Sequence, residues 1–140
     1  MHSYSYYEIV IGQKEEFSVE ITEDMQNMFF CISGDNNPMH TDEAYAKSKG
    51  FRKGALVYGM LTATFYSTLV GTLLPGKNCL FHEADIQFRK PVYIGDRIKI
   101  LGECIDKNDT VKVLTVKAKV YNQNDELVST AKLKVGVLDE

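Results

Sequence analysis

Residues 59–72 read GMLTATFYSTLVGT, and this stretch decides the fold. A helix drawn over it is apolar nearly all round, since it carries Met60, Leu61, Ala63, Phe65, Tyr66, Leu69 and Val70. Such a helix must be covered by other structure. The mostly apolar stretch from Ala55 to Pro75 is interrupted by Gly59, Gly71 and several Thr and Ser residues. We therefore interpret it as the buried helix of a soluble protein and not as a membrane span.

The chain that follows this helix alternates between apolar and polar residues, which is typical of half-buried strands. Four strands are predicted, over residues 79–89, 97–105, 111–121 and 127–137. Because one face of each strand is apolar and the other polar, we expect an antiparallel sheet with one side in the core. A sheet curled around the apolar helix would bury both elements at once.

The chain before the central helix predicts one strand and two short helices. Residues 14–21 alternate as a strand does, and residues 23–33 have apolar residues at helical spacing, including Met28 and Ile32. A second short helix is predicted to begin after Thr41, which we interpret as its N-cap. The central helix is thus preceded by two small helices and their connection.

The connection between these helices, within SGDNNPMHTD at residues 33–42, carries the candidate chemistry. Its Asp and Asn residues favour turns, and Pro38 disfavours a helical conformation in the residue before it. Taken alone, such a string is most often only a turn. A carboxylate at Asp35 and an imidazole at His40 are also the groups that general acid–base catalysis on a water molecule uses. The N-terminus of the helix that begins at Gly59 would offer N–H groups to a developing oxyanion.

Composition bounds the class of protein. The 140 residues fit one domain, 44% of them are hydrophobic and 25% charged, and the net charge of −3 does not favour nucleic-acid binding. Three cysteines without a C-x-x-C pair argue against a disulfide framework and a zinc site, and favour free thiols in a reducing compartment. The N-terminal MHSYSYYEIV lacks the features of a signal peptide, so we expect a cytoplasmic protein that does not act at a membrane.

Three segments in order resemble one known family. SGDNNPMHTD matches every fixed position of S-G-D-x-N-P-x-H-x-D, the hydratase motif of MaoC-like dehydratases and (R)-specific enoyl-CoA hydratases. LVYGMLTATFYSTLVGTLLPG is similar to the segment in which the family has V-H-G-M-L, and IQFRKPVYIGDRI to its F-x-x-P-V-x-x-G-D strand and turn. The resemblance covers about 100 residues. It implies an α+β hot-dog fold, with an antiparallel sheet wrapped around a long central helix, as one domain over residues 1–140.

The resemblance also implies the roles of individual residues. Asp35 and His40 match the catalytic pair of the family, and Gly59 matches the glycine whose N–H holds the thioester oxygen. Asn37 matches the motif residue that shapes the loop, and Ser67 matches by spacing a serine near the catalytic water.

Two further substrate-binding residues are expected, Tyr58 from the same resemblance and Val70 from its position on the central helix. Tyr58 stands where the family usually has a histidine, beside the thioester, and this departure bears on substrate range. Val70, together with Tyr66, is expected to limit the acyl pocket.

The implied activity is that of a hydro-lyase, which interconverts trans-2-enoyl and (R)-3-hydroxyacyl thioesters of coenzyme A or acyl-carrier protein. No metal or redox cofactor is needed, because the thioester itself stabilises the charge. The resemblance also implies a homodimer paired along sheet edges, or a larger assembly built from such dimers. Two alternatives stay open: a hot-dog thioesterase, and an acyl-CoA-binding module that no longer catalyses, for which Tyr58 is the only hint.

Overall fold

The main layer of the molecule is a five-stranded antiparallel sheet. A computed structural model describes residues 1–138, so the last two residues of the predicted domain lie outside the described part of the chain. The strands are β1 (Lys14–Glu20), β2 (Cys79–Phe88), β3 (Arg97–Asn108), β4 (Val113–Tyr121) and β5 (Leu127–Val137). Their order is β1-β3-β4-β5-β2, which makes β1 and β2 the edges of the sheet.

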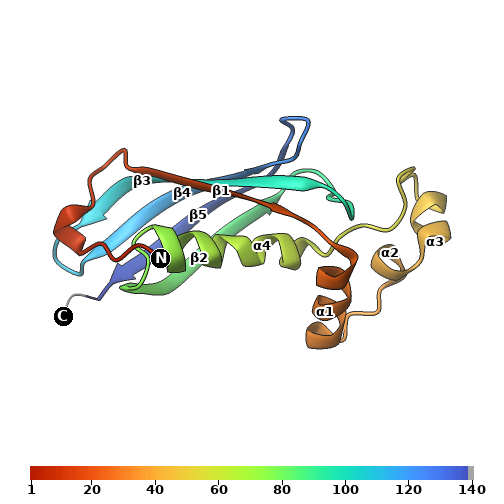
Figure 1. Ribbon diagram of the computed structural model, residues 1–140, viewed down its shortest axis with the longest axis horizontal. Coiled ribbons are helices and arrows are strands. Elements are labelled where there is room, and N and C mark those ends of the chain that lie inside the picture. Colours follow the sequence, from red (N-terminus) through yellow and green to blue (C-terminus); the bar gives the residue numbers. More distant parts are fainter. Residues whose placement is uncertain (139–140) are drawn as a thin grey trace.

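The central helix α4 (Gly59–Thr68) runs along one face of this sheet (Figure 1). It continues into one wider, π-helical turn, η2 (Leu69–Leu73). Leu61, Tyr66 and Leu69 are buried against the inward side chains of the strands. The predicted α+β architecture, an antiparallel sheet around a central helix, is confirmed.

One face of α4 is open, where the sequence predicted a helix covered on every side. Met60 keeps 59% of its surface exposed, and Thr64 and Ser67 on the same side are exposed as well. These positions are separated by four and three residues, so they form one stripe along the helix. The sheet of a single chain therefore covers α4 only in part.

Helix α1 (Glu23–Ser33) has the predicted bounds, and it buries only part of its apolar face. Thr22 caps it by accepting a hydrogen bond from the Met25 N–H at 3.2 Å. The apolar positions Met28 and Ile32 are exposed, Ile32 by 84%, whereas the polar Gln26 is only 6% exposed. The predicted helix is therefore present, with Met25 and Phe29 of its apolar positions packed on the core.

The predicted tight connection contains a short helix of its own, α2 (Pro38–Thr41). Proline suits the first position of a helix because its missing N–H has no partner there. Thr41, which was predicted to be the N-cap of the next helix, is instead the last residue of α2. The N-cap of α3 (Glu43–Ser48) is Asp42, whose side chain accepts a hydrogen bond from the Tyr45 N–H at 3.0 Å. Near the N-terminus, η1 (Tyr6–Glu8) forms a single 3₁₀ turn.

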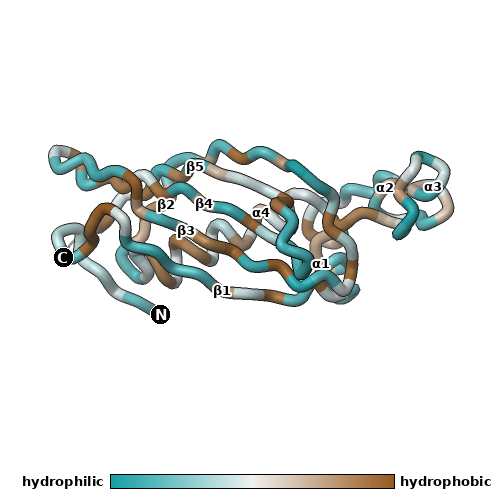
Figure 2. Tube along the Cα trace, turned by 90° about the horizontal axis from the view of Figure 1, so that it is seen from above, coloured by the Kyte–Doolittle hydropathy of each residue, from teal (hydrophilic) through white to brown (hydrophobic). Residues whose placement is uncertain are grey.

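The helices α1, α2 and α3 gather beyond one end of the sheet, at the end where α4 begins (Figures 1 and 2). Seen from above in Figure 2, α4 lies beneath the strands, while α2 and α3 extend past them. Within residues 1–138, no helix is long and apolar enough to cross a membrane. The arrangement brings the motif loop to the N-terminus of the central helix.

Close packing of η2 on β3 gives the first prediction. A Cβ added at Gly102 would lie 2.6 Å from Leu69 Cδ2 and 3.2 Å from Val116 Cγ1, and both of these side chains are fully buried. We expect Gly102→Ala to lower the free energy of unfolding by about 1–3 kcal/mol, measured by urea denaturation. Gly71→Ala is the matched control, because a Cβ at Gly71 has no neighbour within 4 Å. Equal urea midpoints for Gly102→Ala and the unsubstituted protein would contradict this account of the packing.

Candidate active site

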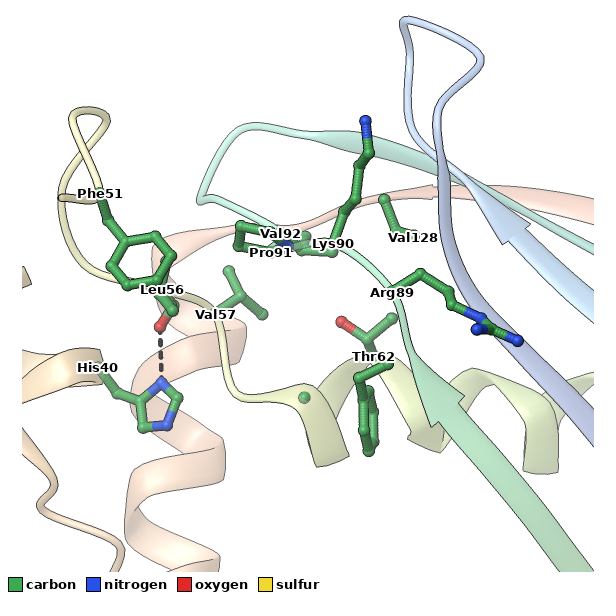
Figure 3. Close-up of a pocket in the computed structure, with 12 residues that line it drawn as sticks. His40, Phe51, Leu56, Val57, Thr62, Arg89, Lys90, Pro91, Val92 and Val128 are labelled. Atoms are coloured by element: carbon green, nitrogen blue, oxygen red, sulfur yellow. Dashed lines mark hydrogen bonds between the residues drawn. The ribbon is translucent and has the colours of Figure 1, made fainter. Parts of the chain in front are cut away.

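His40 on α2 has one ring nitrogen fixed and the other available. Its Nδ1 lies 2.9 Å from the carbonyl oxygen of Leu56, shown as the dashed line in Figure 3. Since a carbonyl oxygen only accepts hydrogen bonds, Nδ1 must carry the proton. In the neutral ring, Nε2 is then the acceptor. His40 can therefore take up or release a proton at Nε2 without losing the bond that orients it.

The aromatic ring of Tyr58 packs against the imidazole ring of His40. The two ring centroids are 4.2 Å apart with an interplanar angle of 30°, and Phe29 packs on Tyr58 at 4.9 Å. Tyr58 is only 2% exposed, and its hydroxyl donates to the backbone oxygen of Asp35. Burial, and after it the charge of Asp35, raises the pKa of Tyr58, so the hydroxyl stays protonated as a donor at neutral pH.

Asp35 and Asn37 shape the loop through local bonds. Asp35 Oδ1 accepts from the Asn37 N–H at 3.1 Å, and Asn37 Oδ1 accepts from the Met39 N–H at 2.9 Å. Asn37 is thereby the N-cap of α2, the helix that carries His40. The carboxylate of Asp35 is exposed. Asp35 and His40 are connected through Tyr58, which contacts both.

Gly59 is the first residue of α4, and the helix N-terminus is free of a side-chain cap. Tyr58 occupies the N-cap position but makes no capping hydrogen bond. The first N–H groups of a helix have no acceptor within the helix, and they attract negative charge. A Cβ at Gly59 would lie 3.1 Å from the Phe88 ring, so a larger residue would crowd this point. The N-terminus of α4 is therefore suited to hold an oxyanion.

His40 and Gly59 border the same pocket, of about 300 Å³. Its lining is mainly apolar and is formed by His40, Phe51, Leu56, Val57, Gly59, Thr62, Phe88, Arg89, Lys90, Pro91, Val92 and Val128. In Figure 3 the charged ends of Arg89 and Lys90 point away from the others. Among residues 1–138, the hydroxyl of Thr62 is the one buried side-chain oxygen or nitrogen that lacks a hydrogen-bond partner in the protein.

The remaining predicted site residues lie elsewhere. Tyr58 is packed beneath His40 and does not line the pocket. Ser67 is exposed on α4, and Val70 is fully buried in the core. Tyr66 is buried too, and its hydroxyl donates to Ser129 Oγ at 2.7 Å. The structure thus brings together His40 and Gly59, with Asp35 and Asn37 on the adjoining loop, and leaves Ser67 and Val70 away from this pocket.

Sequence reasoning missed two polar residues of the site. Thr62 follows Gly59 by three residues and so lies on the same side of α4. Gln26 is buried in α1 and hydrogen-bonds the backbone around His40 and Tyr58. Neither lies in a recognisable motif. Only the spacing of Thr62 from Gly59 gave a signal that could have identified it.

Fold and site together define a hot-dog domain whose candidate acid–base site lies at the N-terminus of its central helix. The chain belongs to the MaoC-like domain family, whose pattern it matches over residues 8–125. The predicted family is thereby confirmed.

Individual relatives carry related names. The chain is 30% identical over 125 residues to an (R)-specific enoyl-CoA hydratase of Aeromonas caviae, covering 89% of this chain and 92% of that one. It is 33% identical over 99 residues to a 3-hydroxybutyryl-CoA dehydratase of Methylorubrum extorquens, covering 70% and 62%. Among solved structures, an unliganded R-hydratase of Pseudomonas aeruginosa superposes with a TM-score of 0.89 at 31% identity, covering 97% of this chain and 86% of that one.

The Tyr58 hydroxyl gives the second prediction. Tyr58→Phe removes the hydrogen bond to Asp35 but keeps the ring against His40. We expect the free energy of unfolding to fall by about 0.5–1.5 kcal/mol, the usual net value of one hydrogen bond, as measured by urea denaturation. Tyr45→Phe, at an exposed tyrosine, is the control and should leave the midpoint unchanged. If both variants unfold at the same urea concentration, the hydroxyl does not hold the loop.

Proposed function

We propose that this protein catalyses the reversible addition of water to trans-2-enoyl thioesters, giving (R)-3-hydroxyacyl thioesters. One observation carries the proposal: His40, oriented by its bond to Leu56, and the uncapped N-terminus of α4 border the same apolar pocket. The intact hydratase motif, and relatives named hydratases and dehydratases, support the same activity.

The roles follow from the chemistry of each group. Asp35 acts as the general base that removes a proton from water as its oxygen bonds to C3 of the acyl group. His40 orients that water and, when it is protonated at Nε2, supplies the proton that C2 takes up. The proton left on Asp35 returns to His40 before the next turnover. The thioester oxygen becomes enolate-like in between, and the Gly59 N–H stabilises it. Asn37 contributes by capping α2, and Tyr58 by supporting the His40 ring.

The substrate is an acyl thioester of coenzyme A or of acyl-carrier protein. Its carbonyl supplies the charge stabilisation, so the reaction requires no metal or redox group. A pocket of about 300 Å³ favours short acyl chains. The three cysteines, all free thiols, support a reducing compartment such as the cytoplasm.

The third prediction tests the catalytic pair. With crotonyl-CoA as substrate, we expect Asp35→Asn and His40→Asn each to lower kcat by about 100-fold or more, followed as loss of enoyl-thioester absorbance. Asp24→Asn, at an exposed carboxylate on α1, is the control and should retain activity.

Other outcomes separate the alternatives. Full activity in Asp35→Asn would overturn the assigned mechanism. Release of a free thiol without hydration would identify a thioesterase. Tight binding of acyl-CoA without turnover, over a series of chain lengths, would identify a binding module.

We also propose that two copies of the chain pair along β2. This strand is a sheet edge, and unpaired edges offer backbone groups to another strand. Its last residue, Phe88, is exposed and lies against Gly59, at the start of the open stripe of α4. An apolar residue such as Met60 beside an open edge is typical of an interface.

The fourth prediction concerns this pairing. Met60→Glu places a charge on the open stripe and should shift the protein from dimer to monomer in sedimentation-equilibrium experiments. Val111→Glu is the matched control, at an equally exposed apolar residue in the turn between β3 and β4, and should remain dimeric. A monomeric unsubstituted protein would overturn the proposed pairing. A Met60→Glu variant that stays dimeric would exclude α4 from the interface.

A further inference from the structure

Gln26 is a polar residue at a buried position, where an apolar residue is usual. It is the buried residue of α1, although Met28 and Ile32 on the same helix are exposed. Burying a side-chain amide is unfavourable unless its hydrogen-bonding groups find partners. The interior position of Gln26 is therefore explained by the bonds that its amide makes.

These bonds reach three backbone positions on two segments. Gln26 Nε2 donates to the carbonyl oxygen of Leu56 at 3.1 Å and to that of His40 at 3.3 Å. Gln26 Oε1 accepts from the Tyr58 N–H at 3.3 Å. One amide thus joins α2, which carries the imidazole, to the residue that immediately precedes α4.

The carbonyl of Leu56 is shared between Gln26 and the catalytic imidazole. It accepts from His40 Nδ1 at 2.9 Å and from Gln26 Nε2, which together can occupy both of its lone pairs. The direction of this carbonyl decides which nitrogen of His40 carries the proton. Gln26 holds the carbonyl, the His40 backbone and the N-cap of α4 in one arrangement.

We propose that Gln26 is a positioning residue, which fixes the tautomer of His40 and its placement relative to the N-terminus of α4. The catalytic part of this inference rests on the proposed hydratase function; the tautomer part does not. Gln26 acts through its two donated bonds, since they reach the His40 backbone and the carbonyl that orients the ring. Small displacements of a catalytic group are costly, so the expected effect is on turnover and not on substrate binding.

The fifth prediction uses two variants of similar length. Gln26→Met removes every hydrogen bond of the amide, and Gln26→Glu keeps an acceptor for the Tyr58 N–H while losing both donors as a carboxylate. We expect each to lower kcat on crotonyl-CoA by about 10-fold to 100-fold with a small change in KM. Asn27→Met, at the exposed neighbour on α1, is the matched control and should keep the kcat of the unsubstituted protein.

The deciding measurement does not require turnover. Long-range ¹H–¹⁵N NMR spectra at about pH 8, where a free imidazole is neutral, report which ring nitrogen carries the proton. His40, assigned with His40→Asn, should be protonated at Nδ1 in the unsubstituted protein and in Asn27→Met. It should become a mixture of tautomers in both Gln26 variants. If Gln26→Met does not fold, Gln26→Glu gives the same reading.

The outcomes distinguish this inference from the proposed function. An unchanged His40 tautomer in the folded Gln26 variants overturns the positioning role, whatever happens to kcat. If the unsubstituted protein does not hydrate crotonyl-CoA, the proposed function fails for that substrate, and the NMR result still decides the role of Gln26. A changed tautomer in these variants, absent from Asn27→Met, supports the role.

Discussion

The burial of α4 is the constraint on which the rest of the structure depends. The helix has no charged residue, and Leu61, Ala63 and Tyr66 need a cover. The sheet supplies that cover on one side, and the fit is close enough that β3 has a glycine beneath Leu69. Once α4 lies along the sheet, its N-terminus must emerge at one end. The uncapped N–H groups there adjoin an apolar pocket, where they interact with charge more strongly than they would in water.

The polar side chains of the site hydrogen-bond mainly to backbone atoms. The Leu56 carbonyl accepts two hydrogen bonds, and the Tyr58 side chain connects the His40 ring to the Asp35 backbone. Because these partners are backbone atoms, their positions follow from the fold and not from other flexible side chains. Thr62 is the contrast, since its buried hydroxyl has no protein partner. Such a group is unfavourable in the folded protein, by about 1–3 kcal/mol.

Much of this architecture could be predicted from sequence, because strand alternation and helix periodicity report directly on burial within one chain. The motif placed Asp35, Asn37 and His40 on one loop, next to the helix that begins at Gly59. Periodicity could not show which apolar stripe stays open, so Met28 and Met60 were assigned to a cover that this chain does not supply. In the same way, a glutamine on a short helix is read as solvated, because its burial depends on backbone carbonyls from distant segments.

Tyr58, which stands where the family motif has a histidine, shows how a fold can accommodate a departure from a motif. A histidine in that place was expected to lie beside the thioester, whereas Tyr58 turns its ring under His40 and its hydroxyl to the Asp35 backbone. The hydroxyl of this longer side chain thereby holds the catalytic loop by a backbone atom, while its ring packs between Phe29 and His40. It does not cover the Asp35 carboxylate, which is exposed to water in the single chain. A carboxylate acts as a base on one bound water most effectively where bulk water is excluded. The open stripe of α4 begins at Met60 and β2 ends at Phe88, both next to Gly59, so the proposed pairing of two chains would bring a second chain close to the site.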